Sequence, residues 1–170
     1  LEWLPQETLA YRGCRARNQV HIHLQGELLA SELLVLGLGA AGQPFDEGEL
    51  LQELHIEGLW RDRGWIRAQD RALLDGPCGL AGLPVLGTLV LAQAQAWSGP
   101  QAEALLERSR ALLEAQPIRA AVTLLHGRLL LLRVLAAELE PATQLMRALR
   151  GLWREQAWGQ PPSEPRIWRT

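Results

Sequence analysis

The spacing of apolar residues changes once along this chain, and that change constrains the fold more than any other feature. Before Trp97, short apolar runs are separated by glycine and turn residues, which is the pattern of β-strands. In Val20–Leu24, apolar residues alternate strictly with histidine, as in a strand with one buried face. After Trp97, apolar residues recur at helical spacing. We therefore expect a mainly β fold of the α+β class, with two helices late in the chain.

The strand-rich part, residues 1–97, contains several predicted strands. Glu27–Leu36 is almost continuously apolar, so we expect it to lie between two layers. Asp62–Gly64 and Asp75–Pro77 are predicted turns. Strands of this length and spacing indicate stacked or sandwiched sheets. The predicted strands are Val20–Leu24, Glu27–Leu36, Leu50–Leu59, Trp65–Leu74 and Gly87–Gln95.

The later part, residues 98–160, is predicted to form a helix, a hairpin and a second helix. Ser98-Gly99-Pro100 is typical of a helix start, and a proline at 117 ends that helix. We read residues 1–170 as a single domain. The remaining expected elements are strands Ile118–Leu125 and Arg128–Leu135 around the turn His126-Gly127, a helix from Pro141 to about Trp158, and an extended tail over residues 161–170.

Composition excludes several classes of protein. The net charge of −2 argues against nucleic acid as the main partner, since such binding draws on a net basic face. The two cysteines, Cys14 and Cys78, are far apart and form no disulfide framework, so we expect a cytoplasmic protein with reduced thiols. No apolar run reaches the ~18 residues that a membrane-spanning helix needs. We therefore expect neither nucleic acid nor membrane among the partners.

Nothing in the sequence is typical of an enzyme. No serine lies in a Gly-x-Ser-x-Gly elbow, and neither cysteine has a local histidine signature. Gly37, Gly39 and Gly42 match a bare G-x-G-x-x-G, but Pro44 follows where a dinucleotide-binding helix would offer an amide. Turn geometry explains these glycines adequately. The sequence predicts a protein without catalytic activity or a tightly bound cofactor.

Two of the four histidines are candidate metal ligands. His21 and His23 share one face of a predicted strand, and neutral imidazoles suit borderline ions such as Ni²⁺ or Zn²⁺. Two ligands do not make a tight site, so a structural or solvent-facing role is the alternative.

Two carboxylates, Glu2 and Glu32, are embedded in apolar sequence. A buried charge requires a partner, bound water or a metal ion. For Glu32 the alternative to a metal is an ion pair with an arginine such as Arg61 or Arg63.

Three segments stand out in this chain: Leu1–Glu7, Glu32–Gly48 and Pro165–Thr170. They resemble, in the same order, fixed points of one family, the urease accessory protein UreD, also called UreH. The resemblance covers essentially the whole chain. The Cys-His and Gly-rich segments that UreD proteins carry upstream have no counterpart before Leu1, so we interpret the chain as the C-terminal portion of a UreD-like protein. Leu38 and Gln43 stand where the family usually has Arg and Glu.

The resemblance implies both a fold and a function. The fold would be β-helix-like stacked sheets with two helices. The function would be that of a metallochaperone component that acts with UreF and UreG on urease apoprotein and assists nickel insertion, with nickel only in transit. Glu32, Glu2, His21 and His23 would then lie on a metal route, and a tail of Arg166, Ile167, Trp168 and Thr170 would bind a partner or dock on the fold.

Two other functions stay open. The first is a diverged or truncated β-rich interaction scaffold without nickel delivery, which the uncharged Leu38 and Gln43 favour. The second is a polysaccharide-acting enzyme of β-helical fold, which the dispersed aspartates disfavour.

Overall fold

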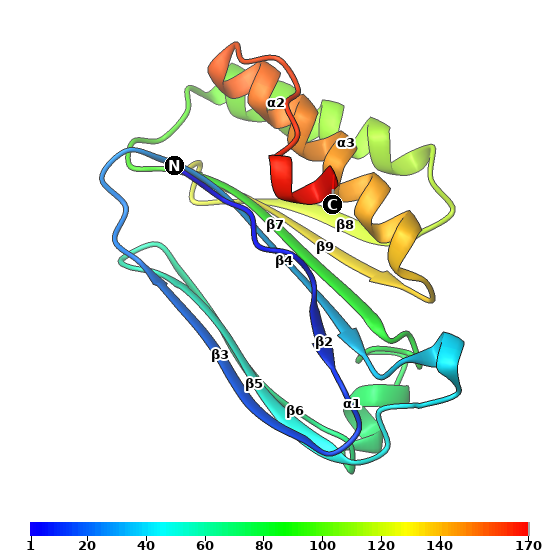
Figure 1. Cartoon of the computed structure of the whole chain (residues 1–170). Coiled ribbons are helices and arrows are strands. Elements are labelled where there is room, and N and C mark those ends of the chain that lie inside the picture. The colour runs from blue at the N-terminus through cyan, green and yellow to red at the C-terminus, as the bar shows by residue number, and fades with distance from the viewer. Residues whose placement is uncertain (170) are drawn as a thin grey trace.

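The computed structural model describes residues 1–169, which form three layers (Figure 1). Two long helices cover one face of a six-stranded sheet, and a three-stranded sheet covers its other face. The elements, in chain order, are β1 (Glu2–Trp3), β2 (Thr8–Ala10), β3 (Cys14–Ile22), β4 (Glu27–Leu36), η1 (Gly39–Ala41), β5 (Gly48–Ile56), β6 (Trp60–Arg67), α1 (Arg71–Asp75), β7 (Val85–Gln93), α2 (Gly99–Glu114), β8 (Arg119–Leu125), β9 (Leu129–Ala136), α3 (Leu139–Trp158) and η2 (Arg166–Arg169).

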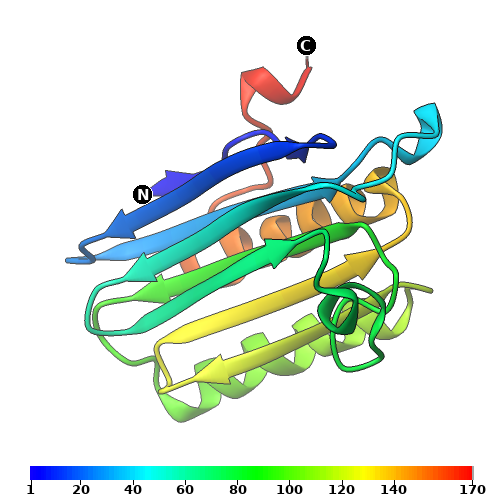
Figure 2. The ribbon, with the colours of Figure 1, turned by 90° about the horizontal axis from the view of Figure 1, so that it is seen from below.

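The large sheet has the strand order β1-β4-β7-β9-β8, and β2 pairs with β4 further along the same edge as β1. β1 and β2 run parallel to β4, whereas the other neighbours are antiparallel. In the small sheet, β5 lies between β3 and β6. Figure 2 shows the small sheet over the β4 side of the large sheet, with β8 at the far edge. β4 therefore lies between two layers, as its apolar sequence predicted.

Side chains of β4 alternate between the two faces of the large sheet. Leu29 joins the core under the helices, which also contains the fully buried Trp153 of α3. Leu28 and Leu34 point the other way and pack against the small sheet in two separate apolar clusters. Because side chains alternate along a strand, β4 contributes both to the core under the helices and to the apolar clusters between the sheets.

The two long helices begin and end at recognisable signals. Ser98 precedes α2, and the Gln101 side chain accepts from the Ser98 backbone N–H at 3.3 Å and from its hydroxyl at 2.9 Å. α3 begins at Leu139, so Pro141 lies within the first turn, where a missing N–H costs nothing. Gly159 ends α3 in the left-handed conformation, with φ 61°. Within residues 1–169, no helix is both long and apolar enough to span a bilayer.

Two sequence predictions about β6 are wrong. Asp62–Gly64 is not a turn but the middle of β6, and the turn instead occupies residues 57–59, where Gly58 supplies a φ of 67°. The predicted strand Trp65–Leu74 ends early because α1 begins at Arg71, with the Asp70 side chain accepting from the Leu73 N–H at 3.0 Å.

The tail prediction is also wrong in part. Residues 161–165 have no regular structure, but Arg166–Arg169 forms the 3₁₀ turn η2 instead of an extended segment.

At the level of fold class, the β-rich α+β prediction is confirmed. β8 and β9 form an antiparallel pair around His126-Gly127, but β9 also pairs with β7 and so belongs to the large sheet. A separate helix-hairpin-helix unit is therefore not established, and β-helix-like stacking stays a prediction.

Candidate functional site

A row of polar side chains crosses the interior between the two sheets. Ladder pairing places Glu32 of β4 beside Thr88 of β7, and Thr88 beside Arg133 of β9. On the facing small sheet, the Asn18 side chain donates to that of Gln52 at 3.2 Å. Apolar clusters lie on both sides of this row. We call the row of Asn18, Glu32, Gln52, Asp62, Thr88 and Arg133 the polar belt.

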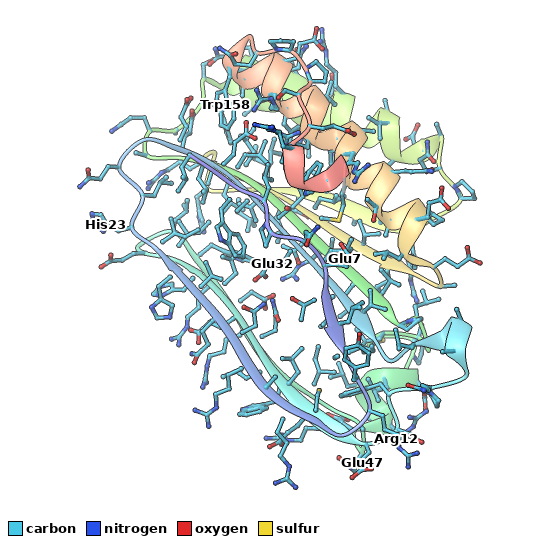
Figure 3. The ribbon with its side chains drawn as sticks, viewed as in Figure 1. Glu7, Arg12, His23, Glu32, Glu47 and Trp158 are labelled. Carbon is cyan, nitrogen blue, oxygen red and sulfur yellow. The ribbon has the colours of Figure 1, made fainter. Side chains whose placement is uncertain are left out.

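Glu32 is the acid at the inner end of the polar belt. Its side chain points into the space between the sheets (Figure 3). Burial raises the pKa of Glu32, while a hydrogen bond with the Gln52 side chain and the charge of Arg133 act in the opposite direction. One oxygen, Oε1, is buried without a hydrogen-bond partner among the described residues. A half-buried carboxylate with an unpaired oxygen is a group that water or a cation would satisfy.

Arg133 and Asp62 form the outer end of the polar belt. They are ion-paired, and each side chain is 45% exposed, so the pair lies where the interior meets solvent. Arg133 also donates to the Thr88 hydroxyl at 2.8 Å and lies over the Trp60 ring, 5.5 Å from its centroid. The arginine is thereby held by three neighbours and cannot swing away from the opening without losing these contacts.

A cavity of about 190 Å³ follows the polar belt from Glu32 to Asp62 and Arg133. Its walls combine the belt side chains with apolar residues such as Leu86. This volume is enough for several water molecules. The arrangement offers a polar interior, lined by two carboxylates and one arginine, that reaches the surface.

The polar belt contains five residues that sequence reasoning missed: Asn18, Gln52, Asp62, Thr88 and Arg133. Their signal was weak, because each is a single polar residue in an otherwise apolar period-two pattern. The predicted ion pair of Glu32 with Arg61 or Arg63 is wrong. Both arginines project from the opposite face of β6 and pair with Glu53.

His21 and His23 lie away from the polar belt, on the outer face of the small sheet. Figure 3 shows His23 pointing outward. His23 Nδ1 lies 2.7 Å from Glu57 Oε2, and this hydrogen bond, together with the His23 charge, lowers the pKa of Glu57. Both histidines therefore lie on one face, as the strand alternation predicted. The imidazole that packs against His21 is that of His55 and not that of His23, with ring centroids 5.1 Å apart.

Glu2 lies in a third place, on the helix side of the large sheet. Its carboxylate is ion-paired with Arg150 and Arg154 of α3. Arg150 is only 4% exposed, and burial lowers its pKa. Glu2 and Glu32 therefore lie on opposite faces of the same sheet. The four sequence-predicted metal ligands occupy three places and do not form one site.

The tail residues approach the same helix. The guanidinium carbons of Arg147 and Arg150 lie 4.9 and 5.3 Å from the centroid of the Trp168 ring. Arg150 also donates to the Ser163 carbonyl at 2.5 Å. Arg166 is exposed. The Ile167 side chain and all of Thr170 lie outside the described part of the chain.

Leu38 and Gln43 face each other across an isolated antiparallel bridge. The Leu38 N–H donates to the Gln43 carbonyl at 2.7 Å, and the Gln43 N–H donates back at 3.0 Å. Opposite charges at these positions would be neighbours, so their joint absence is consistent with an ion pair replaced as a unit.

Comparison with known proteins gives one consistent result. The model of the family described as UreD urease accessory protein matches residues 1–169. The urease accessory protein UreD of Leptothrix cholodnii is 44% identical over 100% of this chain and 63% of its own length. Similar proteins of the same name from Paracidovorax citrulli and Variovorax paradoxus are 40% and 38% identical, over 99% and 100% of this chain.

The chain spans about 63% of the length of the curated relatives that it matches. The family match includes the segments Leu1–Glu7 and Glu32–Gly48 and all but the last residue of Pro165–Thr170. The chain belongs to the UreD urease accessory protein family.

Proposed function

We propose that this chain is part of a urease maturation factor that acts with UreF and UreG on urease apoprotein and assists nickel insertion. Membership of the UreD family supports a role in urease maturation. That role is of the chaperone type, in which the protein supplies surfaces and a path for the metal rather than a reaction. Urea hydrolysis belongs to urease itself.

The observation that carries the nickel part of the proposal is the polar belt. Nickel is here a cargo, which needs ligands that bind it and release it again. Carboxylate, amide and hydroxyl oxygens along the 190 Å³ cavity would offer such weak contacts. Glu32 is the best placed of them, because its Oε1 has no hydrogen-bond partner among the described residues.

The opening of the cavity would control what enters. Arg133 and Asp62 neutralise each other at the surface, so the opening has no net positive charge to repel a divalent cation. Further inside, the Glu32 carboxylate adds a negative charge when it is ionised, and its surroundings only partly balance that charge. The electrostatic potential for a cation would therefore become more favourable from the opening toward Glu32.

The test is nickel-dependent activation of urease apoprotein by the full-length protein with UreF and UreG. Glu32→Gln keeps the size of the side chain but removes its charge. We expect Glu32→Gln to bind the partners normally in co-purification and to lower the urease activity reached at limiting nickel at least fivefold. Glu27→Gln, an exposed acid on the same strand, is the matched control and should activate normally.

Two results would count against the proposal. Normal activation by Glu32→Gln would remove the polar belt from the nickel path. Failure of the unmodified protein to co-purify with UreF, UreG or the apoprotein would remove the maturation role altogether.

A second candidate function is a scaffold that joins the same assembly without delivering nickel. The uncharged bridge of Leu38 and Gln43 favours it, because the family usually carries charges there. Restoring them as Leu38→Arg with Gln43→Glu separates the two functions. A scaffold would bind its partners but activate urease only in the restored form.

A further inference from the structure

The outer face of the small sheet contains a second group of metal-ligating side chains. His21 of β3 and His55 of β5 are directly paired in the parallel ladder. Glu53 precedes His55 by two residues and so lies on the same face. One ligand atom from each of these three side chains lies within 4.8 Å of the other two. We propose that His21, His55 and Glu53 form a surface site for a borderline divalent transition metal ion such as Ni²⁺ or Zn²⁺.

Imidazole nitrogen is the ligand that such ions favour, and parallel pairing holds the two rings in one register. The rings already pack edge to face, at 86°. Because the His21 side chain is 63% exposed, it can turn to bring its nitrogen within bonding distance without disturbing the core. His21 Nε2 also lies 3.6 Å from Glu53 Oε1, so the carboxylate faces the space between the rings.

The charged surroundings set the character of the site. Glu53 accepts from Gln19 at 2.7 Å and from Arg61 at 2.7 Å, and it lies 3.3 Å from Arg63. These contacts fix the carboxylate but also neutralise it. The two imidazoles would therefore be the principal ligands, with water completing the coordination. Structural zinc sites use four protein ligands, so this site is of the exchangeable kind.

His23 is not part of the site. Its Nδ1 is engaged with Glu57 at 2.7 Å, and it lies beyond the last residue of β3. The contrast makes His23 a natural control, because it is exposed on the same face but has no second imidazole paired with it. The proposed site is also separate from the polar belt, from which the small sheet divides it. It does not rest on the proposed role in urease maturation.

The experiment is calorimetric titration of the full-length, untagged protein with Ni²⁺ and with Zn²⁺, using Mg²⁺ as the negative control ion. We expect His21→Ala and His55→Ala each to weaken binding at this site at least tenfold. His23→Ala should change it less than twofold. Imidazole NMR signals of His21 and His55, but not of His126, should shift on addition of Zn²⁺.

Correct folding of each variant is checked by tryptophan fluorescence, and His21→Asn serves as a second variant if His21→Ala does not fold. The proposal is overturned if neither ion binds more tightly than about 1 mM, or if His23→Ala weakens binding as much as His21→Ala. Loss of binding in His55→Ala with normal urease activation would leave the surface site standing and separate it from maturation.

Discussion

Replacing Glu32 by leucine tests whether the polar belt is kept for function rather than for stability. Inward-facing residues of β4 on either side of Glu32 include Ala30 and Leu34, both buried. Glu32→Leu would make the inward face of β4 apolar between the two inter-sheet clusters. We expect this variant to be more stable than the natural protein and to fail in nickel-dependent urease activation.

The size of the effect follows from the contacts of Glu32. Its unpartnered Oε1 represents a cost of about 1–3 kcal/mol, which leucine removes. Against this, the Gln52 side chain loses a hydrogen bond worth about 1 kcal/mol, and the attraction to the half-exposed Arg133 is worth less than about 1 kcal/mol. Taking the middle of that cost, the net gain in unfolding free energy is about 0–1 kcal/mol. For a protein of this size, the upper figure corresponds to a rise in Tm of roughly 2–4 °C.

The pH dependence gives the sharper test. Burial raises the pKa of Glu32 in the folded protein above its ordinary value near 4.5. Above the folded pKa, the folded state bears the cost of the charged carboxylate. As the pH falls through that pKa, the folded state takes up the proton first and the cost disappears. The advantage of Glu32→Leu should therefore be largest above the folded pKa and shrink as the pH falls through it toward 4.5.

Urea denaturation followed by tryptophan fluorescence, repeated between pH 4 and 8, measures both quantities, with Glu27→Gln as the control. A Glu32→Leu variant that loses more than about 1 kcal/mol would refute the reasoning, because the belt would then contribute to stability. An advantage that is the same at every pH would show that the charge of Glu32 is not its source.

Three further substitutions test a close backbone approach beside η1 and the core under the helices. Gly37→Ala should lower the unfolding free energy by about 2–4 kcal/mol, because the residue has a φ of 76° and an added Cβ would lie 2.6 Å from the Phe45 nitrogen. Gly42→Ala should lower it by only about 1–2 kcal/mol, because that residue has a φ of 67° but open space around it. Equal losses for the two variants in urea denaturation would contradict this reasoning. Trp153→Phe should cost about 1–2 kcal/mol, since it removes the indole N–H that donates to the Ser109 hydroxyl at 2.8 Å, and a neutral result in the same assay would show that this buried bond contributes nothing.

Local patterns predicted the elements whose environment is uniform along their length. Glu27–Leu36 was predicted with the bounds that β4 has, because most of its residues are apolar and both of its faces are buried. α2 was predicted from Ser98 and the proline that follows, which are signals read within a few residues. β6 was predicted only at its end, residues 65–67, because Asp62 and Gly64 favour turns when considered alone. Their place in a strand depends on partners from elsewhere, Arg133 for Asp62 and the β5 backbone for Gly64.

The candidate sites show the same difference between residues that local sequence identifies and residues that only distant contacts bring in. Glu32, His21 and His23 were chosen from their own neighbours in sequence, and the first two do lie in chemically suggestive places. Their partners were beyond reach, because Gln52 meets Glu32 only where the two sheets pack face to face, and His55 and Arg133 are brought in by pairing between strands that are distant in sequence. Register is set by the fit of whole apolar faces, which no short segment specifies alone.

Strand β5 serves both candidate sites and explains why they can be tested separately. Leu50, Leu54 and Ile56 point inward and are at most 1% exposed, so a slip by one residue would expose all of them. The register that these residues fix places Gln52 in the polar belt and His55 on the outer face. Because the Gln52 and His55 side chains point in opposite directions, Glu32→Gln disturbs the space between the two sheets, whereas His55→Ala disturbs the outer face of the small sheet. A substitution that shifts the register would instead abolish both sites together, and only that shared loss would make the two proposals inseparable.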